Sequence, residues 1–92
     1  MADRASQYEY INSAATTQVK SGRGRLRRIV FNKPIASSTV TIYDETSGTS
    51  KVIGLITNTS DVKPYFLDFN IIFGTGLKIV TSGADFITVV YE

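Results

Sequence analysis

Apolar and polar residues alternate in short stretches along most of the chain. The clearest is "STVTIYDE", in which Val40 and Ile42 fall on one face while Thr39 and Thr41 fall on the other. Alternation with a period of two residues is typical of a β-strand that buries one face. Comparable runs are "QYEYINS", "ATTQVK", "RLRRIVFN", "KVIGLIT", "YFLDFNIIF", "LKIVT" and "FITVVYE".

Segments such as "SGRG", "DETSGTS", "NTSDVKP" and "SGAD" separate these runs, and their residues favour turns. About eight strands at roughly 8–12-residue spacing are typical of a sandwich or barrel. No stretch has the period of an amphipathic helix. We therefore predict an all-β protein, a single small β-sandwich (jelly-roll-like or Ig-like) of about eight antiparallel strands. Residues 1–92 form one domain in this prediction, with residues 1–7 as a flexible N-terminal arm.

Three strands support more detailed expectations. Gly54 in "KVIGLIT" indicates a bulge or the close approach of another backbone. In "YFLDFNIIF", alternation puts the apolar residues Tyr65, Leu67, Phe69 and Ile71 on one face. The last strand, "FITVVYE", is apolar on both faces, so its second face either lies within the sandwich or meets a neighbouring subunit.

The size of the chain limits how it can be stabilised. A domain of 92 residues buries only about 60–65% of its unfolded surface. Disulfides, metals or oligomerisation usually support such small domains. The sequence has no cysteine and no histidine, which excludes disulfides and zinc sites built from thiolates or imidazoles. We therefore expect a homo-oligomer, or attachment to a larger assembly.

The N-terminal segment "MADRASQYEY" lacks the apolar core of a signal peptide. The longest apolar runs, such as "NIIFG", are much shorter than the roughly 20 residues that span a membrane. We therefore expect a chain made in the cytoplasm that has no membrane partner.

Catalytic groups are sparse. Without cysteine or histidine the usual nucleophilic triads cannot form. The carboxylates are Asp3, Glu9, Asp44, Glu45, Asp61, Asp68, Asp85 and Glu92. Asp44 and Glu45 open a predicted turn, Asp61 and Asp85 fall in predicted loops, and a buried Asp68 would need an arginine partner. We expect no enzymatic activity, no catalytic residue, no cofactor and no metal site.

The basic residues are concentrated in one segment. "KSGRGRLRRIVFNK" holds six of the ten basic residues, and the segment from Glu9 to Asp44 contains no acidic residue between its ends. The candidate partner-docking residues are Arg23, Arg25, Arg27, Arg28 and Lys33. On a regular strand Arg25 and Arg27 share one face and Arg28 points to the other, unless a bulge intervenes.

Two interpretations of this segment remain open. Guanidinium groups bind carboxylates and phosphates bidentately, which favours a docking surface. Arginines also discourage unwanted pairing of strand edges, which requires no partner. We expect nucleic acid not to be the partner, because the segment lacks aromatic residues interleaved with its arginines and the isoelectric point of about 9.0 is only moderately basic.

Three segments resemble motifs of small bacteriophage virion proteins: "GRLRRIVFNKP", "STVTIYDETSGT" and "FGTGLKIVTSGADFITVVYE". In that group they read as a "G-x-L-x-x-I-x-V-N" strand, an "ITIYD" strand and a "TGL-x-V-x-T-x-G-A-D-x-T-V-x-Y" ending. The resemblance extends from Thr16 to Tyr91, and Phe31 stands where the pattern has valine. It implies an all-β virion component without enzymatic activity, similar to capsid decoration or cement proteins and to modules of head fibres and tails.

The function implied by this resemblance is that of a capsid cement or decoration protein that binds across joints between capsid subunits. Its partner would be the major capsid protein or another virion protein, and its location the capsid surface of the virion. A homotrimer is favoured, because it would match three-fold positions of a capsid. The alternative is a glycan- or receptor-binding module of a phage head or tail fibre, which would use the loops "DETSGTS" and "NTSDVKP" and exposed tyrosines.

Overall fold

The computed structural model describes residues 7–58 and 63–92. These residues form eight β-strands and no helix: β1 (Gln7–Ile11), β2 (Thr16–Ser21), β3 (Gly24–Lys33), β4 (Thr39–Tyr43), β5 (Val52–Thr57), β6 (Tyr65–Phe73), β7 (Gly76–Thr81) and β8 (Phe86–Tyr91). The all-β prediction is confirmed, and each predicted strand is present. The expected N-terminal arm lies outside the described residues except for Gln7, which begins β1.

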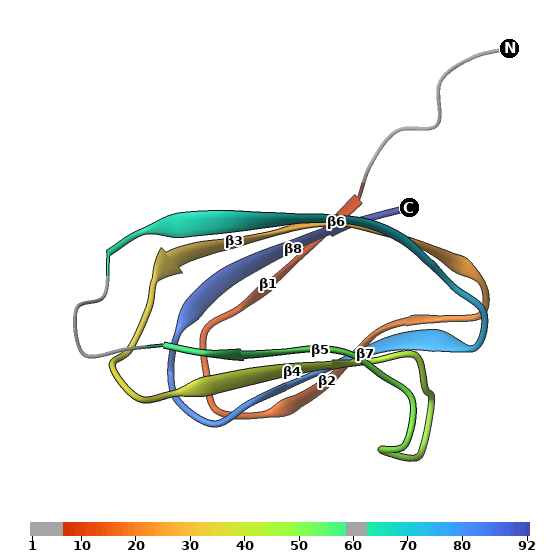
Figure 1. The fold of residues 1–92 in the computed structure, drawn as a ribbon, viewed down its shortest axis with the longest axis horizontal. Helices are drawn as coiled ribbons and strands as arrows, with labels where there is room; N and C mark the ends of the chain where they lie inside the picture. The colour runs from red at the N-terminus through yellow and green to blue at the C-terminus, as the bar shows by residue number, and fades with distance from the viewer. Residues whose placement is uncertain (1–6, 59–62) are drawn as a thin grey trace, which may run out of the picture.

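The strands form two antiparallel sheets that face each other, β1-β8-β3-β6 and β2-β7-β4-β5 (Figure 1). Strands from opposite ends of the chain pair in order: β1 with β8, β2 with β7, β3 with β6 and β4 with β5. One long hairpin that is rolled over itself produces this order, which is the jelly roll. Of the two predicted kinds of sandwich, the jelly roll is therefore the one that forms.

The core lies between the sheets and consists of the inward-facing positions of the alternating strands. Val40 and Ile42 of β4 are completely buried, as predicted, and so are Ile87 and Val89 of β8. The other face of β8 is only half-buried and lies on the outside of the sandwich. Of the two interpretations of "FITVVYE", burial of both faces within the sandwich is therefore wrong.

Two strands depart from regular alternation. In β5, Gly54 pairs with Ile42 but Val52 pairs with Tyr43, so Ile53 is an extra residue in a bulge, as Gly54 indicated. In β6, the predicted inward face is correct up to Phe69, but Ile71 is 39% exposed and packs outside the core cluster.

At one end of the sandwich the loops β3–β4, β5–β6 and β7–β8 meet around Asp85, which is completely buried. Its carboxylate lies 2.7 and 2.8 Å from the Ser38 hydroxyl and accepts hydrogen bonds from the Asn58 amide at 2.7 Å and the Ile35 backbone N–H at 3.2 Å. The Tyr65 hydroxyl donates to the Asn58 carbonyl oxygen at 2.5 Å. Asp85 is a loop residue, as predicted. It is buried, however, and its hydrogen bonds link its own loop to the other two.

Candidate docking surface

A bulge in β3 brings the strand's arginines to one side of the sheet. The pairing of β3 with both β6 and β8 shifts between Leu26 and Arg28. Leu26 and Ile29 are completely buried, and the two residues between them, Arg27 and Arg28, are both exposed. The bulge that was the stated exception to the regular-strand prediction is therefore present, and it turns Arg28 to the outer face that Arg25 and Arg27 share.

The same outer face carries aromatic residues from other strands. Pairing aligns Tyr8, Val90, Arg28 and Asp68 in one row across the sheet, and Tyr10, Thr88, Val30 and Phe66 in the next. Tyr8 is 72% exposed, Phe66 54% and Tyr10 47%. We call this surface the arginine face and define it by Arg25, Arg27, Arg28, Lys33, Tyr8, Tyr10, Phe66 and Phe86.

Arg28 lies between a carboxylate and an aromatic ring. Its Nε donates to Asp68 Oδ1 at 2.5 Å, and its Cζ lies 4.4 Å from the centroid of the Phe66 ring. The hydrogen bond and the charge of Asp68 together raise the pKa of Arg28 despite slight desolvation. Both side chains of the pair remain about half exposed or more. The arginine partner expected for Asp68 is thus present, but the carboxylate is on the surface and not buried.

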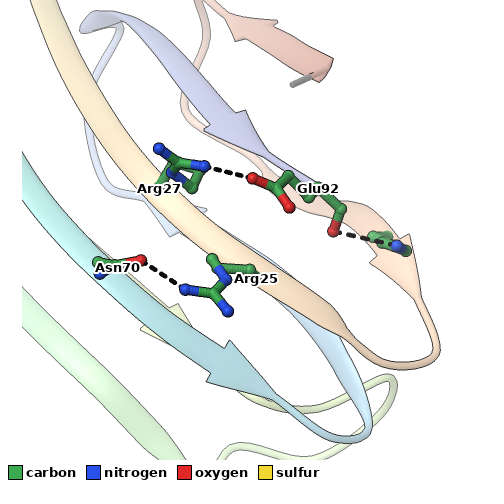
Figure 2. Close-up of polar contacts among 5 residues, drawn as sticks. Arg25, Arg27, Asn70 and Glu92 are labelled. Carbon is green, nitrogen blue, oxygen red and sulfur yellow. Dashed lines mark hydrogen bonds and ion pairs between the residues drawn. The ribbon is translucent and has the colours of Figure 1, made fainter. Parts of the chain in front are cut away.

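Arg25 and Arg27 extend to opposite sides of β3 (Figure 2). Arg25 donates to Asn70 Oδ1 on β6 at 2.8 Å, whereas Arg27 forms an ion pair with the Glu92 carboxylate. The Glu92 backbone also pairs with Arg25, through N–H···O bonds of 2.8 and 3.1 Å. A Cβ at Gly24 would lie 2.3 Å from the Glu92 backbone oxygen, so this close approach requires glycine. Because Asn70 is neutral, it leaves the charge of Arg25 uncompensated.

The remaining candidates lie at the ends of β3. Lys33 Nζ lies 5.3 Å from the centroid of the Phe86 ring, and Tyr10 meets that ring edge-on at 6.2 Å. Arg23 is exposed in the turn before β3 and is a neighbour of the arginine face, not a member. Across the described residues, the five candidate cations form two ion pairs, with Asp68 and Glu92, which leaves three positive charges in excess.

The sequence did not reveal the aromatic part of this surface. Tyr8, Tyr10, Phe66 and Phe86 come from β1, β6 and β8, and only the pairing of these strands with each other and with β3 brings them together. The period of two in "QYEYI" does put Tyr8 and Tyr10 on one face, which was the one local signal. The lack of aromatic residues interleaved with the arginines is therefore no argument against nucleic acid, because the fold supplies exposed aromatic residues from other strands.

Polar residues elsewhere hold loops in place. The Asp44 carboxylate accepts hydrogen bonds from the backbone N–H groups of Gly74, Thr75 and Gly76 at 3.0, 2.8 and 3.2 Å. Asp44 opens the loop after β4, as predicted, but its carboxylate caps the β6–β7 turn. Desolvation opposes its charge, but these three bonds and Lys51 outweigh desolvation and hold the pKa of Asp44 below its usual value.

The neighbouring Glu45 caps its own loop. The hydrogen bond from the Ser50 hydroxyl lowers the pKa of Glu45 most, with desolvation opposing and the Lys51 amide assisting. In residues 7–58 and 63–92, no three His, Cys, Asp or Glu side chains gather closely enough to hold a metal ion. The described part of the chain likewise contains no helix that could cross a membrane.

No protein-family model and no curated protein sequence matches this chain. The resemblance to virion proteins therefore depends on the three motif segments alone.

Proposed function

We propose that this protein is a non-enzymatic structural component of a bacteriophage virion that binds an acidic surface of a neighbouring virion protein through the arginine face. The observation that carries the proposal is the gathering of Arg25, Arg27, Arg28 and Lys33 with exposed aromatic residues on one outer sheet face. The virion assignment comes from the sequence motifs.

The composition of the arginine face suits a protein interface. Arginine and tyrosine are enriched at the centres of protein interfaces, where a few such side chains supply most of the binding energy. Three of the cations in and beside this face have no ion-pair partner among the described residues: Arg23, Arg25 and Lys33. An acidic partner surface would pair with these positive charges. This complementarity would speed association and fix the orientation of the two proteins in the complex.

As a capsid cement, the protein would act through many copies. Each bound copy stabilises the assembled shell relative to its open form, because binding to one state shifts the equilibrium towards it. The major capsid protein is accordingly the first partner to test.

The test looks for a major capsid gene beside the gene of this chain and measures binding to purified empty capsids assembled from its product. The double variant Arg25→Gln/Arg27→Gln should weaken binding at least about tenfold, because truncating charges that are desolvated in an interface is costly. Lys51→Gln is the control, since Lys51 is exposed in the other sheet's loop region. Unchanged capsid binding by the double variant, in a protein of unchanged melting temperature, would refute the proposal.

The glycan-binding alternative is favoured by one observation, the exposure of Tyr8 and Tyr10 side by side along β1. Tyrosine rings can stack on sugars, and jelly rolls serve in lectins as well as in capsids. Binding to host cell-surface polysaccharide that is lost in Tyr8→Ala/Tyr10→Ala would support this alternative. Binding of single-stranded nucleic acid that weakens steeply with salt would instead identify the arginine face as a nucleic-acid surface.

A further inference from the structure

The four edge strands of the sandwich are not equally protected. An edge strand presents unpaired backbone groups, and charges or irregularities normally keep other strands away. In β1, Glu9 occupies an inward-facing position opposite Val89; in β2, Lys20 does so opposite Leu77, next to a register shift. In β6, Asp68 is charged and Asn70 has a positive φ of 54°.

β5 has no such protection along its regular part. "VIGLIT" contains no charged residue, and its bulge lies at Ile53, so Gly54–Thr57 pairs regularly with β4. Among the described strands β5 pairs with β4 alone, which leaves its other edge open. Leu55 points outward from this strand and is 63% exposed beside the open edge, where a second strand could cover it.

The strand is also complementary to itself. Antiparallel pairing must place inward residues opposite inward residues, because directly opposed residues point to the same face. Leu55 opposite Leu55 of a second copy satisfies this rule, with Gly54 opposite Ile56, and it leaves the bulge at the end of the ladder. Neither pair opposes like charges, and Leu55 would be covered by its counterpart.

We propose that two copies of this chain pair through β5 about a two-fold axis at Leu55, which joins their second sheets into one eight-stranded sheet. This axis is perpendicular to the sheets, because the paired strands are antiparallel and coplanar. The sheet β1-β8-β3-β6 lies across the sandwich from β5 (Figure 1). The arginine faces are on the outer side of that sheet and would therefore point in the same direction. The pairing of β5 strands does not depend on the proposed function, but it would allow both arginine faces of one dimer to bind the same partner surface.

Cysteine cross-linking tests the register, because the natural chain has no thiol. In Leu55→Cys the two sulfurs would face each other, and mild oxidation should yield a disulfide-linked dimer. Val52→Cys is the matched control: Val52 is 53% exposed on the same strand. Its two copies would lie about 20 Å apart in this register, six residues at the rise of a strand. Cross-linking of Val52→Cys as fast as Leu55→Cys would overturn the proposal.

Mass measurement by light scattering across micromolar concentrations tests the association itself. The natural chain should exceed its monomer mass of 10.1 kDa and approach twice that value. Leu55→Asp, which opposes two like charges, should raise the dissociation constant at least about tenfold, whereas Val52→Asp should change it little. A monomer throughout, a trimer, or a dimer that Leu55→Asp leaves intact would each overturn the proposal. Capsid binding is measured separately, so failure here leaves the proposed function standing.

Discussion

Asp85 and Asp68 are both hydrogen-bonded carboxylates on the same small sandwich, yet their surroundings are opposite. Asp85 is completely buried at one end of the fold and is held by the neutral donors of Ser38, Asn58 and Ile35. Asp68 is mostly exposed on the arginine face and pairs with the charged Arg28. Charge pairing is thus found where water is plentiful, and neutral hydrogen bonding where water is excluded.

The difference separates the parts of the molecule that hold the fold together from those that can bind a partner. A buried donor left without its acceptor loses the full energy of its hydration, whereas an exposed ion pair exchanges its partner for water at little cost. The loops around Asp85 therefore depend on that carboxylate for stability. The arginine face can rearrange its ion pairs on binding without destabilising the protein.

The largest effect is expected for Asp85→Ala. The substitution removes the acceptor shared by three neutral donors and leaves a cavity, so the free energy of unfolding should fall by about 2–4 kcal/mol. Urea unfolding followed by circular dichroism measures it.

Asp85→Asn distinguishes hydrogen bonding from charge at this site. Its carbonyl oxygen can still accept from Asn58 and Ile35, while its amide can donate to the Ser38 hydroxyl, which can turn its own proton to the Ile35 carbonyl at 2.8 Å. We expect a loss of less than about 1 kcal/mol. A loss as large as that of Asp85→Ala would mean that the charge itself stabilises the loops, and the comparison with Asp68 would fail.

Tyr65→Phe probes the outer part of the buried network. It removes the hydroxyl that donates to Asn58 but keeps the ring, which stacks on Phe31 at a centroid distance of 4.4 Å. The free energy of unfolding should fall by about 0.5–1.5 kcal/mol. Tyr8→Phe, at an exposed site on the arginine face, is the matched control and should leave the free energy of unfolding unchanged. Equal losses in both variants would contradict the distinction between the interior and the face.

The pKa of Tyr65 gives a further test of the buried network. Burial raises the pKa of the Tyr65 hydroxyl, and the charge of Asp85 raises it further. Ionisation of Tyr65, followed by its ultraviolet absorbance, should therefore occur at higher pH than the ordinary tyrosine pKa of about 10.

Asp44 is intermediate in burial between Asp85 and Asp68, and its carboxylate accepts hydrogen bonds from three backbone N–H groups. Its pKa is lower in the folded protein than in the unfolded chain, so its stabilising contribution is present above pH about 4 and is lost as the pH falls through the folded value. Asp44→Asn should cost about 0.5–1 kcal/mol at pH 7, and the difference from the natural protein should shrink at pH about 3. Urea unfolding at both pH values provides the check, and a difference that grows towards acid pH would contradict the assignment.

Features that depend on neighbouring residues could be predicted from the sequence. The alternation of Val40 and Ile42 predicted the face of β4, and Gly54 indicated either a bulge or the close approach of another backbone, of which β5 has the bulge. The spacing of Leu26 and Ile29 breaks the period of two, and it was the local signal for the bulge that gathers the arginines. The burial of Asp85 could not be predicted, because three loops that are distant in sequence create it. The strand order and the aromatic residues of the arginine face likewise follow from long-range pairing.

The smallest effect on stability is expected for the Arg28–Asp68 pair. Because both side chains are about half exposed or more, their attraction is weakened by water and offset by the entropy of holding two mobile side chains. Arg28→Gln, Asp68→Asn and the double variant should each keep the melting temperature within about 2 °C of the natural protein. Arg28 also covers the Phe66 ring, so Arg28→Gln should expose more of that ring than Asp68→Asn does.

On capsids the two single variants should separate: Arg28→Gln removes a cation that an acidic partner needs, while Asp68→Asn removes a competitor for it and should bind at least as well as the natural protein. A melting temperature that falls steeply in both single variants and recovers in the double would show that this pair stabilises the fold as Asp85 does, and the arginine face would then be a structural surface and not one reserved for a partner.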